Sequence, residues 1–212
     1  MDTSSQRELL SVDAACSITE VMADLAQALA GTGPALGFGD LKSTHVPEQV
    51  AVVIGTSGST GAPKEVGLSA SALLGSARAS NKYLRANFGQ IWSLLLPLTH
   101  VAGVNVLVRS LELGTVPIDL RDTSKDSKAD FTAIVPTQLF RALNGDALLL
   151  EHLKNCQTVL IGGAALPSDI RQRANDLGIT IVSSYGMTET CGGCVYDGIP
   201  LDCVEVGTTA ES

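Results

Sequence analysis

A short loop rich in hydroxyl groups and glycine follows the first strongly apolar run of the chain, at residues 50–54. The loop contains Thr56, Ser57, Gly58, Ser59, Thr60, Gly61, Ala62, Pro63 and Lys64. Hydroxyls and backbone N–H groups of such a loop can surround phosphate oxygens, and the ammonium group of Lys64 adds positive charge. A Walker A loop would need Gly at position 63 and Ser or Thr at position 65, where this chain has Pro63 and Glu65. The pattern therefore predicts a polyphosphate site of another kind, against the alternative of a plain surface turn.

A second polar group follows the apolar run at residues 179–182. It contains Ser184, Tyr185, Gly186, Met187, Thr188 and Glu189. Tyr185 could stack on a base, Thr188 could bind an α-phosphate, and Glu189 could hold Mg²⁺, which takes one or two carboxylates together with phosphate oxygens. Both groups come directly after apolar runs that read as strands, and open α/β sheets bind ligands beyond the carboxyl ends of their strands. We therefore expect the two groups to form one nucleotide site.

Taken together, the two groups resemble the phosphate-binding signature and the second motif of the adenylate-forming superfamily, which includes acyl-CoA ligases, luciferases and the adenylation domains of peptide synthetases. The resemblance implies that Thr56–Lys64 holds the β- and γ-phosphates of ATP and that Glu189 binds Mg²⁺. Family members usually place Gly-Val after the Lys, whereas this chain has Glu65 there. The stretch 160–164 is similar to the adenine and acyl loop of the family, which adds Gly162, Gly163 and Ala164 as binding residues. An ordinary strand-to-helix turn is the alternative for these three.

Two further residues concern the acyl substrate. His100, within residues 96–103, resembles a family position that lines the acyl pocket, with a structural histidine as the alternative. Arg109 would share a helix face with Asn105 and Glu112, so it either pairs with Glu112 in solvent or binds a second carboxylate of the substrate. The segment 190–202 resembles the actinobacterial o-succinylbenzoate-CoA ligase branch of the family. This branch implies an aromatic dicarboxylate, o-succinylbenzoate, as substrate within menaquinone biosynthesis.

The resemblance also implies a reaction. The substrate carboxylate attacks the α-phosphate of ATP, pyrophosphate leaves, and the thiol of coenzyme A then displaces AMP from the acyl-adenylate. The residues that would assist are Lys64, His100, Thr188 and Glu189. In the family, an Asp that binds ribose and a Lys on a mobile C-terminal lobe would follow Val206, so we expect an N-terminal fragment that is weak or inactive alone. Another aryl- or acyl-CoA ligase and a non-catalytic adenylate-binding module are the alternatives.

The elements that position these residues follow from the apolar pattern. Residues 1–16 are polar and are expected to have little regular structure, with one AMP-binding domain over residues 17–212. A capping box at Ser17 and Glu20 predicts a helix that ends at Gly31, and a connecting loop follows to residue 47. Short apolar runs predict strands at 50–54, 91–98, 116–120, 131–135, 159–161 and 179–182. Helices are predicted at 69–88, 101–113, 137–143 and 168–177, with Gly114 and Gly178 as C-caps. The fold class is therefore α/β, a largely parallel sheet flanked by helices, as in the N-terminal domain of adenylate-forming enzymes.

Composition narrows the partners. The 212 residues are 45% apolar and carry a net charge of −8, which argues against a nucleic-acid or anionic-membrane surface. No apolar run approaches the roughly 20 residues that span a bilayer. The five cysteines are an odd set without a secretory signal, and the single Cys191-x-x-Cys194 pair lacks the second ligand pair of a zinc site. We expect reduced thiols in a cytoplasm, and these properties leave the homo-oligomeric state open.

Overall fold

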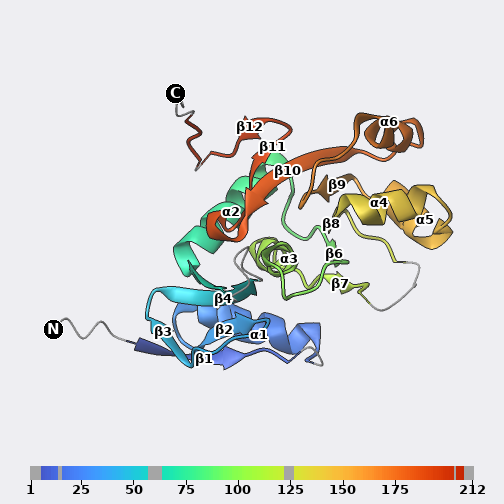
Figure 1. Ribbon diagram of the computed structural model, residues 1–212. Coiled ribbons are helices and arrows are strands. Elements are labelled where there is room, and N and C mark those ends of the chain that lie inside the picture. Colours follow the sequence, from blue (N-terminus) through green and yellow to red (C-terminus); the bar gives the residue numbers. More distant parts are fainter. Residues whose placement is uncertain (1–5, 14–15, 57–63, 122–126, 203, 208–212) are drawn as a thin grey trace.

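Two sheets form the framework of the protein (Figure 1). The computed structural model describes residues 6–13, 16–56, 64–121, 127–202 and 204–207. The five-stranded sheet has the order β3-β1-β2-β4-β5, with strands β1 (Gln6–Ser11), β2 (Ala35–Phe38), β3 (His45–Pro47), β4 (Val50–Thr56) and β5 (Lys64–Ser69). The seven-stranded sheet has the order β12-β11-β10-β9-β8-β6-β7, with strands β6 (Trp92–Leu94), β7 (Ile118–Asp119), β8 (Phe131–Ile134), β9 (Thr158–Ile161), β10 (Ile181–Met187), β11 (Gly192–Tyr196) and β12 (Ile199–Pro200).

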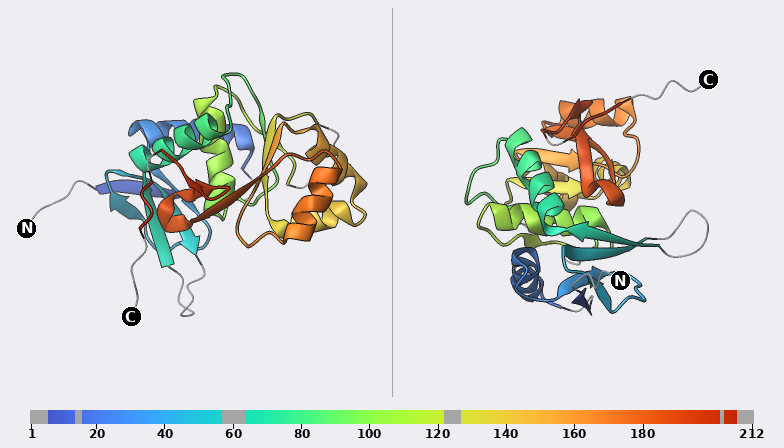
Figure 2. Two further views of the ribbon diagram at one scale, coloured as in Figure 1. Left: turned by 90° about the horizontal axis from the view of Figure 1, so that it is seen from above. Right: turned by 90° about the vertical axis from the view of Figure 1, so that its left-hand side faces the viewer.

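Helices pack between the two sheets and on the far side of the larger one. The helices are α1 (Ile18–Ala30), α2 (Ala70–Tyr83), α3 (Val101–Glu112), α4 (Pro136–Leu143), α5 (Ala147–Asn155) and α6 (Ser168–Asp176), with a 3₁₀ turn η1 (Thr188–Thr190) after β10. Helices α1, α2 and α3 share one apolar core with strands of both sheets, whereas α4, α5 and α6 form a second core with β8, β9 and β10. The same layering is visible from two further directions (Figure 2).

The interior of each sheet is parallel, and every edge except β7 is antiparallel. Strands β1, β2 and β4 run parallel, as do β7, β6, β8, β9 and β10. Strands β3, β5, β11 and β12 pair antiparallel with their neighbours. The predicted α/β class with a largely parallel arrangement is confirmed, although the strands divide into two sheets. Apolar runs fit this arrangement because parallel strands are covered on both faces.

Local signals placed several helix ends correctly. Ser17 and Glu20 form the predicted capping box of α1, and Gly31 ends that helix at a φ of 74°. Ser69 caps α2 by accepting a hydrogen bond from the backbone N–H of Ala72. Gly114 and Gly178 likewise adopt positive φ after α3 and α6, where a side chain would be strained. These caps satisfy backbone groups that the helix itself leaves unpaired.

The N-terminal expectation was wrong for residues 6–11, which form β1. Only Leu9 of this strand is buried, so the strand has no apolar alternation that would reveal it. Its partners are β2 and β3, which lie within the segment 31–47 that was expected to be a loop. Arg7 adds long-range support, because its guanidinium donates to the carbonyl oxygens of Ala28 and Gly33. Helix α5 was also missed, although Asp146 caps it through the N–H of Leu149. Within the described residues, no helix is long and apolar enough to cross a membrane.

Candidate functional site

A cavity of about 610 Å³ opens at the carboxyl ends of β6, β8 and β9, beside β10 and α3. Most of its lining is apolar or glycine, with a few polar side chains, as is usual for a small-molecule site. The residues that line it are Leu96, Pro97, His100, Val101, Ala102, Asn105, Arg109, Ala133, Ile134, Val135, Gln138, Leu160, Gly162, Gly163, Ser184, Gly186, Met187, Thr188, Gly192 and Gly193. The location agrees with the rule that open α/β sheets bind ligands beyond their strand ends.

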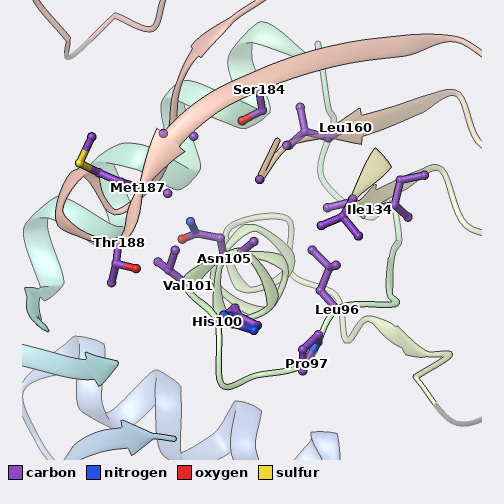
Figure 3. A pocket seen from close by; sticks show the side chains of 18 of the residues that line it. Leu96, Pro97, His100, Val101, Asn105, Ile134, Leu160, Ser184, Met187 and Thr188 are labelled. Carbon is purple, nitrogen blue, oxygen red and sulfur yellow. The ribbon is translucent and has the colours of Figure 1, made fainter. Parts of the chain in front are cut away.

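The walls of the cavity come from segments far apart in the sequence (Figure 3). Helix α3 passes behind the cavity and presents Val101 and Asn105, while His100 and Pro97 lie along one side. Met187 and Thr188 lie at the end of β10, and Leu160 and Ile134 lie across the cavity from them. A ligand in this space would therefore contact the end of β10 and the start of α3 at the same time.

Seven of the residues predicted from sequence line this cavity: His100, Arg109, Gly162, Gly163, Ser184, Gly186 and Thr188. Thr56, Lys64, Ala164, Tyr185 and Glu189 do not line it. The phosphate-loop residues Ser57, Gly58, Ser59, Thr60 and Gly61 fall outside the described residues. The structure thus brings the second motif, the 162–163 turn and the two candidate acyl residues to one place.

The second motif differs from its predicted local structure. The strand was expected to end at residue 182, but β10 continues to Met187. Residues 181–183 pair parallel with β9, and residues 184–187 pair antiparallel with β11, with an irregularity between Tyr185 and Gly186. The tight fit explains the glycine, because a Cβ on Gly186 would lie 1.9 Å from the backbone oxygen of Gly192. The tyrosine at 185 projects into solvent, 64% exposed, as a stacking surface would.

An ion pair joins the two motifs across the sequence. The Nζ atom of Lys64, at the start of β5, lies 2.8 Å from Oε1 of Glu189 in η1. The hydrogen bond from Lys64 holds the pKa of the Glu189 carboxyl below its ordinary value, so the carboxylate is ionised near neutrality. Both side chains are substantially exposed, so this pair contributes little to stability. The ion pair instead fixes the positions of a cationic and an anionic group beside the cavity.

Glu65 faces away from Lys64. Its carboxylate accepts hydrogen bonds from the backbone N–H groups of Lys42, at 2.5 Å, and Ser43, at 3.2 Å. Hydrogen bonding from Ser43, and then from Lys42, lowers the pKa of the Glu65 carboxyl. Successive side chains of a strand point to opposite faces, which places the carboxylate on the other face of β5 from Lys64. The Glu at this position is therefore engaged with the turn at residues 42–43.

Arg109 is buried without an acidic partner. Its side chain is only 3% exposed, and no ion pair links it to any carboxylate in the described part of the chain. Its Nη2 atom donates to Oη of Tyr196 at 3.2 Å, and its guanidinium carbon lies 5.0 Å from the ring centroid of Trp92. The Nε atom has no hydrogen-bond partner among the described residues. Within the described part of the chain, neutral groups alone bind this charge, which is unusual because buried charges are normally paired.

The alternative that Arg109 pairs with Glu112 in solvent is wrong. Glu112 instead accepts from Arg78 of α2, with Nε and Oε2 2.5 Å apart. The helical spacing places Arg109 and Glu112 three residues apart, but the partner of Glu112 comes from the neighbouring helix. The guanidinium is consequently directed to the cavity and its buried surroundings.

Several residues of the site carried too weak a signal in the sequence. Tyr196 and Trp92, which surround Arg109, are fully buried and come from β11 and β6. Asn105 is 1% exposed, lines the cavity, and donates from Nδ2 to the backbone oxygen of Cys191 at 2.6 Å. Its place on the same helix face as Arg109 was the one available signal.

The fold and the cavity define an α/β protein with a ligand site at the carboxyl ends of parallel strands, next to a paired lysine and glutamate. A family model described as AMP-binding enzyme matches residues 3–210. The match covers nearly all of the chain, so the chain belongs to the AMP-binding enzyme family.

Individual relatives agree with this membership. A probable 2-succinylbenzoate-CoA ligase of Mycobacterium tuberculosis (strain ATCC 25618 / H37Rv) is 37% identical, covering 95% of this chain and 58% of the relative. The 2-succinylbenzoate-CoA ligase of Escherichia coli (strain K12) is 33% identical, covering 69% of this chain and 32% of the relative. The o-succinylbenzoate CoA synthetase of Bacillus subtilis with its acyl-adenylate intermediate OSB-AMP superposes with a TM-score of 0.65 at 22% identity, covering 92% of this chain and 49% of that one. The alignments thus cover between 32% and 58% of the length of these larger relatives.

Proposed function

We propose that the chain is the nucleotide- and acyl-binding part of an o-succinylbenzoate-CoA ligase, acting in a cytoplasm within menaquinone biosynthesis. The named relatives support the substrate, and the buried Arg109 supports it independently. The reaction would join an aromatic carboxylate to coenzyme A through an acyl-adenylate, with ATP converted to AMP and pyrophosphate.

The observation that carries this proposal is the uncompensated charge of Arg109 at the cavity. A guanidinium held by a phenol and an indole face keeps its full attraction for an anionic ligand, and its planar fork suits a carboxylate. A substrate with two carboxylates can present one to Arg109 and the other to the nucleotide. An aryl acid with one carboxylate would leave the arginine unpaired when the cavity is filled, which costs binding free energy.

The nucleotide end of the site would lie toward Thr188, Glu189 and Lys64. Thr188 lines the cavity, and the ionised Glu189 carboxylate next to it has the chemistry that Mg²⁺ prefers. A bound Mg²⁺ would neutralise phosphate charge. Lys64 would move from Glu189 to phosphate oxygens, and Tyr185 would offer its exposed ring to the base. Gly162 and Gly163, with Ala164, would allow the backbone to approach the nucleotide closely.

The chemistry requires alignment and charge neutralisation more than a protein nucleophile. The carboxylate to be activated would lie between His100 and Thr188, which both line the cavity (Figure 3). His100 would orient this carboxylate toward the α-phosphate, and Thr188 would donate its hydroxyl to a phosphate oxygen. The apolar walls would exclude water, which would otherwise hydrolyse the acyl-adenylate.

A direct test compares two acids that differ in one carboxylate. Isothermal calorimetry would measure binding of o-succinylbenzoate and of a matched aryl ketone acid that lacks one carboxylate, each with Mg²⁺ and ATP present. We expect the wild-type chain to prefer the dicarboxylate and Arg109→Met to lose that preference. Equal affinity of the wild-type chain for the two acids would refute the substrate proposal. A further assay of pyrophosphate exchange distinguishes an adenylating chain from a non-catalytic adenylate-binding module, which would bind both ligands without exchange.

A further inference from the structure

The backbone oxygen of Cys191 is a buried junction between the two helices behind the cavity and the turn that ends the second motif. Asn105 of α3 donates to it from Nδ2 at 2.6 Å. Ser76 of α2 donates to the same oxygen from Oγ at 3.4 Å, a longer and weaker contact. Cys191 comes directly after Thr190, the last residue of η1, and its own N–H donates to the backbone oxygen of Thr188 at 3.0 Å.

The backbone at this junction is in a conformation that most residues avoid. Cys191 has a φ of 56° and a ψ of 33°, in the left-handed region, where a residue with a Cβ is disfavoured. Such a conformation persists only where surrounding contacts enforce it. The hydrogen bonds to its carbonyl oxygen, which fix the orientation of the peptide that follows, are contacts of that kind.

The asparagine side chain packs closely against the backbone that follows Cys191. A Cβ added to Gly192 would lie 2.2 Å from Nδ2 of Asn105, so the side chain lies directly against the backbone of this glycine. The orientation of the amide is fixed by chemistry, because only the nitrogen can donate to a carbonyl oxygen. The Oδ1 atom then has no hydrogen-bond partner among the described residues. An asparagine that is 1% exposed and keeps one polar atom unsatisfied is costly for stability, which favours a role in the site.

We propose that Asn105 is a positioning residue for the Thr188–Thr190 turn, coupling the helix that carries His100 and Arg109 to the turn that carries Glu189. Ser76 assists it as a weaker second donor. By holding the Cys191 carbonyl, Asn105 keeps the strained turn in the one geometry that presents Thr188 to the cavity and Glu189 to Lys64. This inference rests on the proposed function, in which the turn binds phosphate and Mg²⁺.

The metal-dependent part of nucleotide binding is the property that separates positioning from mere structural support. The affinity of the chain for ATP would be measured by calorimetry with Mg²⁺ and again with a chelator. We expect Asn105→Ala to reduce the increase in ATP affinity that Mg²⁺ produces by about tenfold, which is the effect of losing one buried hydrogen bond. The control is Ser110→Ala, which removes a different buried polar group of α3, a hydroxyl that bonds only to the backbone oxygen of Val106 among the described residues.

A double-mutant cycle with Cys191→Gly tests the strain directly. Glycine adopts positive φ without penalty, so the turn should need Asn105 less in that background. We expect Asn105→Ala to reduce the gain from Mg²⁺ clearly less in Cys191→Gly than in the wild-type chain. Any loss caused by removing the thiol itself cancels in the cycle. Equal effects in both backgrounds would overturn the role of Asn105 in enforcing the left-handed turn.

Two measurements keep the outcomes separate. If the wild-type chain and Asn105→Ala gain equally from Mg²⁺, the inference fails while the proposed function stands. If the wild-type chain does not bind Mg²⁺ and ATP, the proposed function fails, and amide hydrogen exchange of residues 188–192 then decides whether Asn105 holds the turn.

Faster amide hydrogen exchange of residues 188–192 in Asn105→Ala, but not in Ser110→Ala, supports the positioning role, and unchanged exchange refutes it. Should Asn105→Ala not fold, Ser76→Ala is measured in its place, with a smaller effect expected in the same direction and no effect refuting the inference.

Discussion

Replacing Arg109 by Met should leave the stability of the protein nearly unchanged while removing its affinity for a dicarboxylate. Met keeps a long unbranched side chain in the space beside Trp92 but carries no charge. In an ordinary structural site, truncating a buried charged residue costs about 3–5 kcal/mol, because a partner charge is left behind. No such partner exists for Arg109 among the described carboxylates.

The magnitude follows from the contacts of the guanidinium. The variant loses the hydrogen bond to Tyr196, about 1.5–3 kcal/mol for a charged donor, and the stacking on Trp92, about 2 kcal/mol when desolvated. It regains the desolvation free energy of a buried cation, of order several kcal/mol, and about 1–3 kcal/mol for the unpartnered Nε. These contributions oppose one another. We therefore expect the free energy of unfolding to change by less than about 2 kcal/mol.

The assay uses the single tryptophan of the chain, Trp92, as the reporter of urea unfolding. The wild-type chain should be compared with Arg109→Met and with Arg171→Met, because Arg171 has a carboxylate partner, Asp197, at 2.8 Å. Arg171→Met should be destabilised, because it loses this ion pair together with the hydrogen bonds from Arg171 to Oγ of Ser183 and to the backbone oxygen of Ile181. Calorimetry with o-succinylbenzoate should show a loss of about 2–5 kcal/mol in Arg109→Met, the cost of removing one member of a buried charge pair. A loss of more than about 2 kcal/mol in the unfolding free energy of Arg109→Met would refute the reasoning, since the arginine would then be a structural residue.

Two further predictions concern titratable groups. The hydrogen bond from Lys64 lowers the pKa of the Glu189 carboxyl, so the ion pair is fully formed above the ordinary glutamate pKa of 4.5 and is lost as the pH falls through the lower pKa of the folded state. NMR titration should find the Glu189 pKa moving back toward 4.5 in Lys64→Gln, and an unchanged pKa would contradict the pairing. Burial raises the pKa of the Cys156 thiol to about 12, so the contribution of this thiol to stability is present below the ordinary cysteine pKa of 9.0 and is lost as the pH rises above 9.0. At pH 8, peptide mapping after iodoacetamide treatment should find the exposed Cys16 alkylated and Cys156 protected until urea is added. Rapid labelling of Cys156 in the folded chain would contradict its burial.

The local parts of this fold were predictable because they depend on neighbouring residues. The helix from Ser17 to Gly31 is specified by its own capping box and C-cap, and the apolar runs that became β4, β8 and β9 are specified by their composition. Strand β1 was missed because its stability comes from partners tens of residues away and only Leu9 is buried. Similarly, the continuation of β10 depends on pairing with β11, which the sequence of β10 does not reveal.

The two motifs were predicted to share a site, and the ion pair between Lys64 and Glu189 brings their described ends together. The role of Arg109 was harder to predict from the sequence. On a helix, the spacing to Glu112 favours a local ion pair, and that pair would have made the arginine an ordinary surface residue. In the folded chain Glu112 pairs with Arg78 of the neighbouring helix, and the partners of the Arg109 guanidinium among the described residues are Tyr196 and Trp92.

The partner of Glu112 therefore comes from another helix, and spacing along α3 alone does not show whether Arg109 has an acidic partner. Arg78 lies on α2, the helix that also contributes Ser76 to the Cys191 carbonyl. Helix α2 thus has two effects: it binds Glu112, the acid that helical spacing places near Arg109, and it donates a hydrogen bond at the turn that carries Glu189. The two ends of a dicarboxylate substrate would be served by these two effects, because one end needs an unpaired cation and the other needs a fixed metal-binding turn. Periodicity along α3 cannot reveal this, since both effects come from contacts between helices distant in sequence.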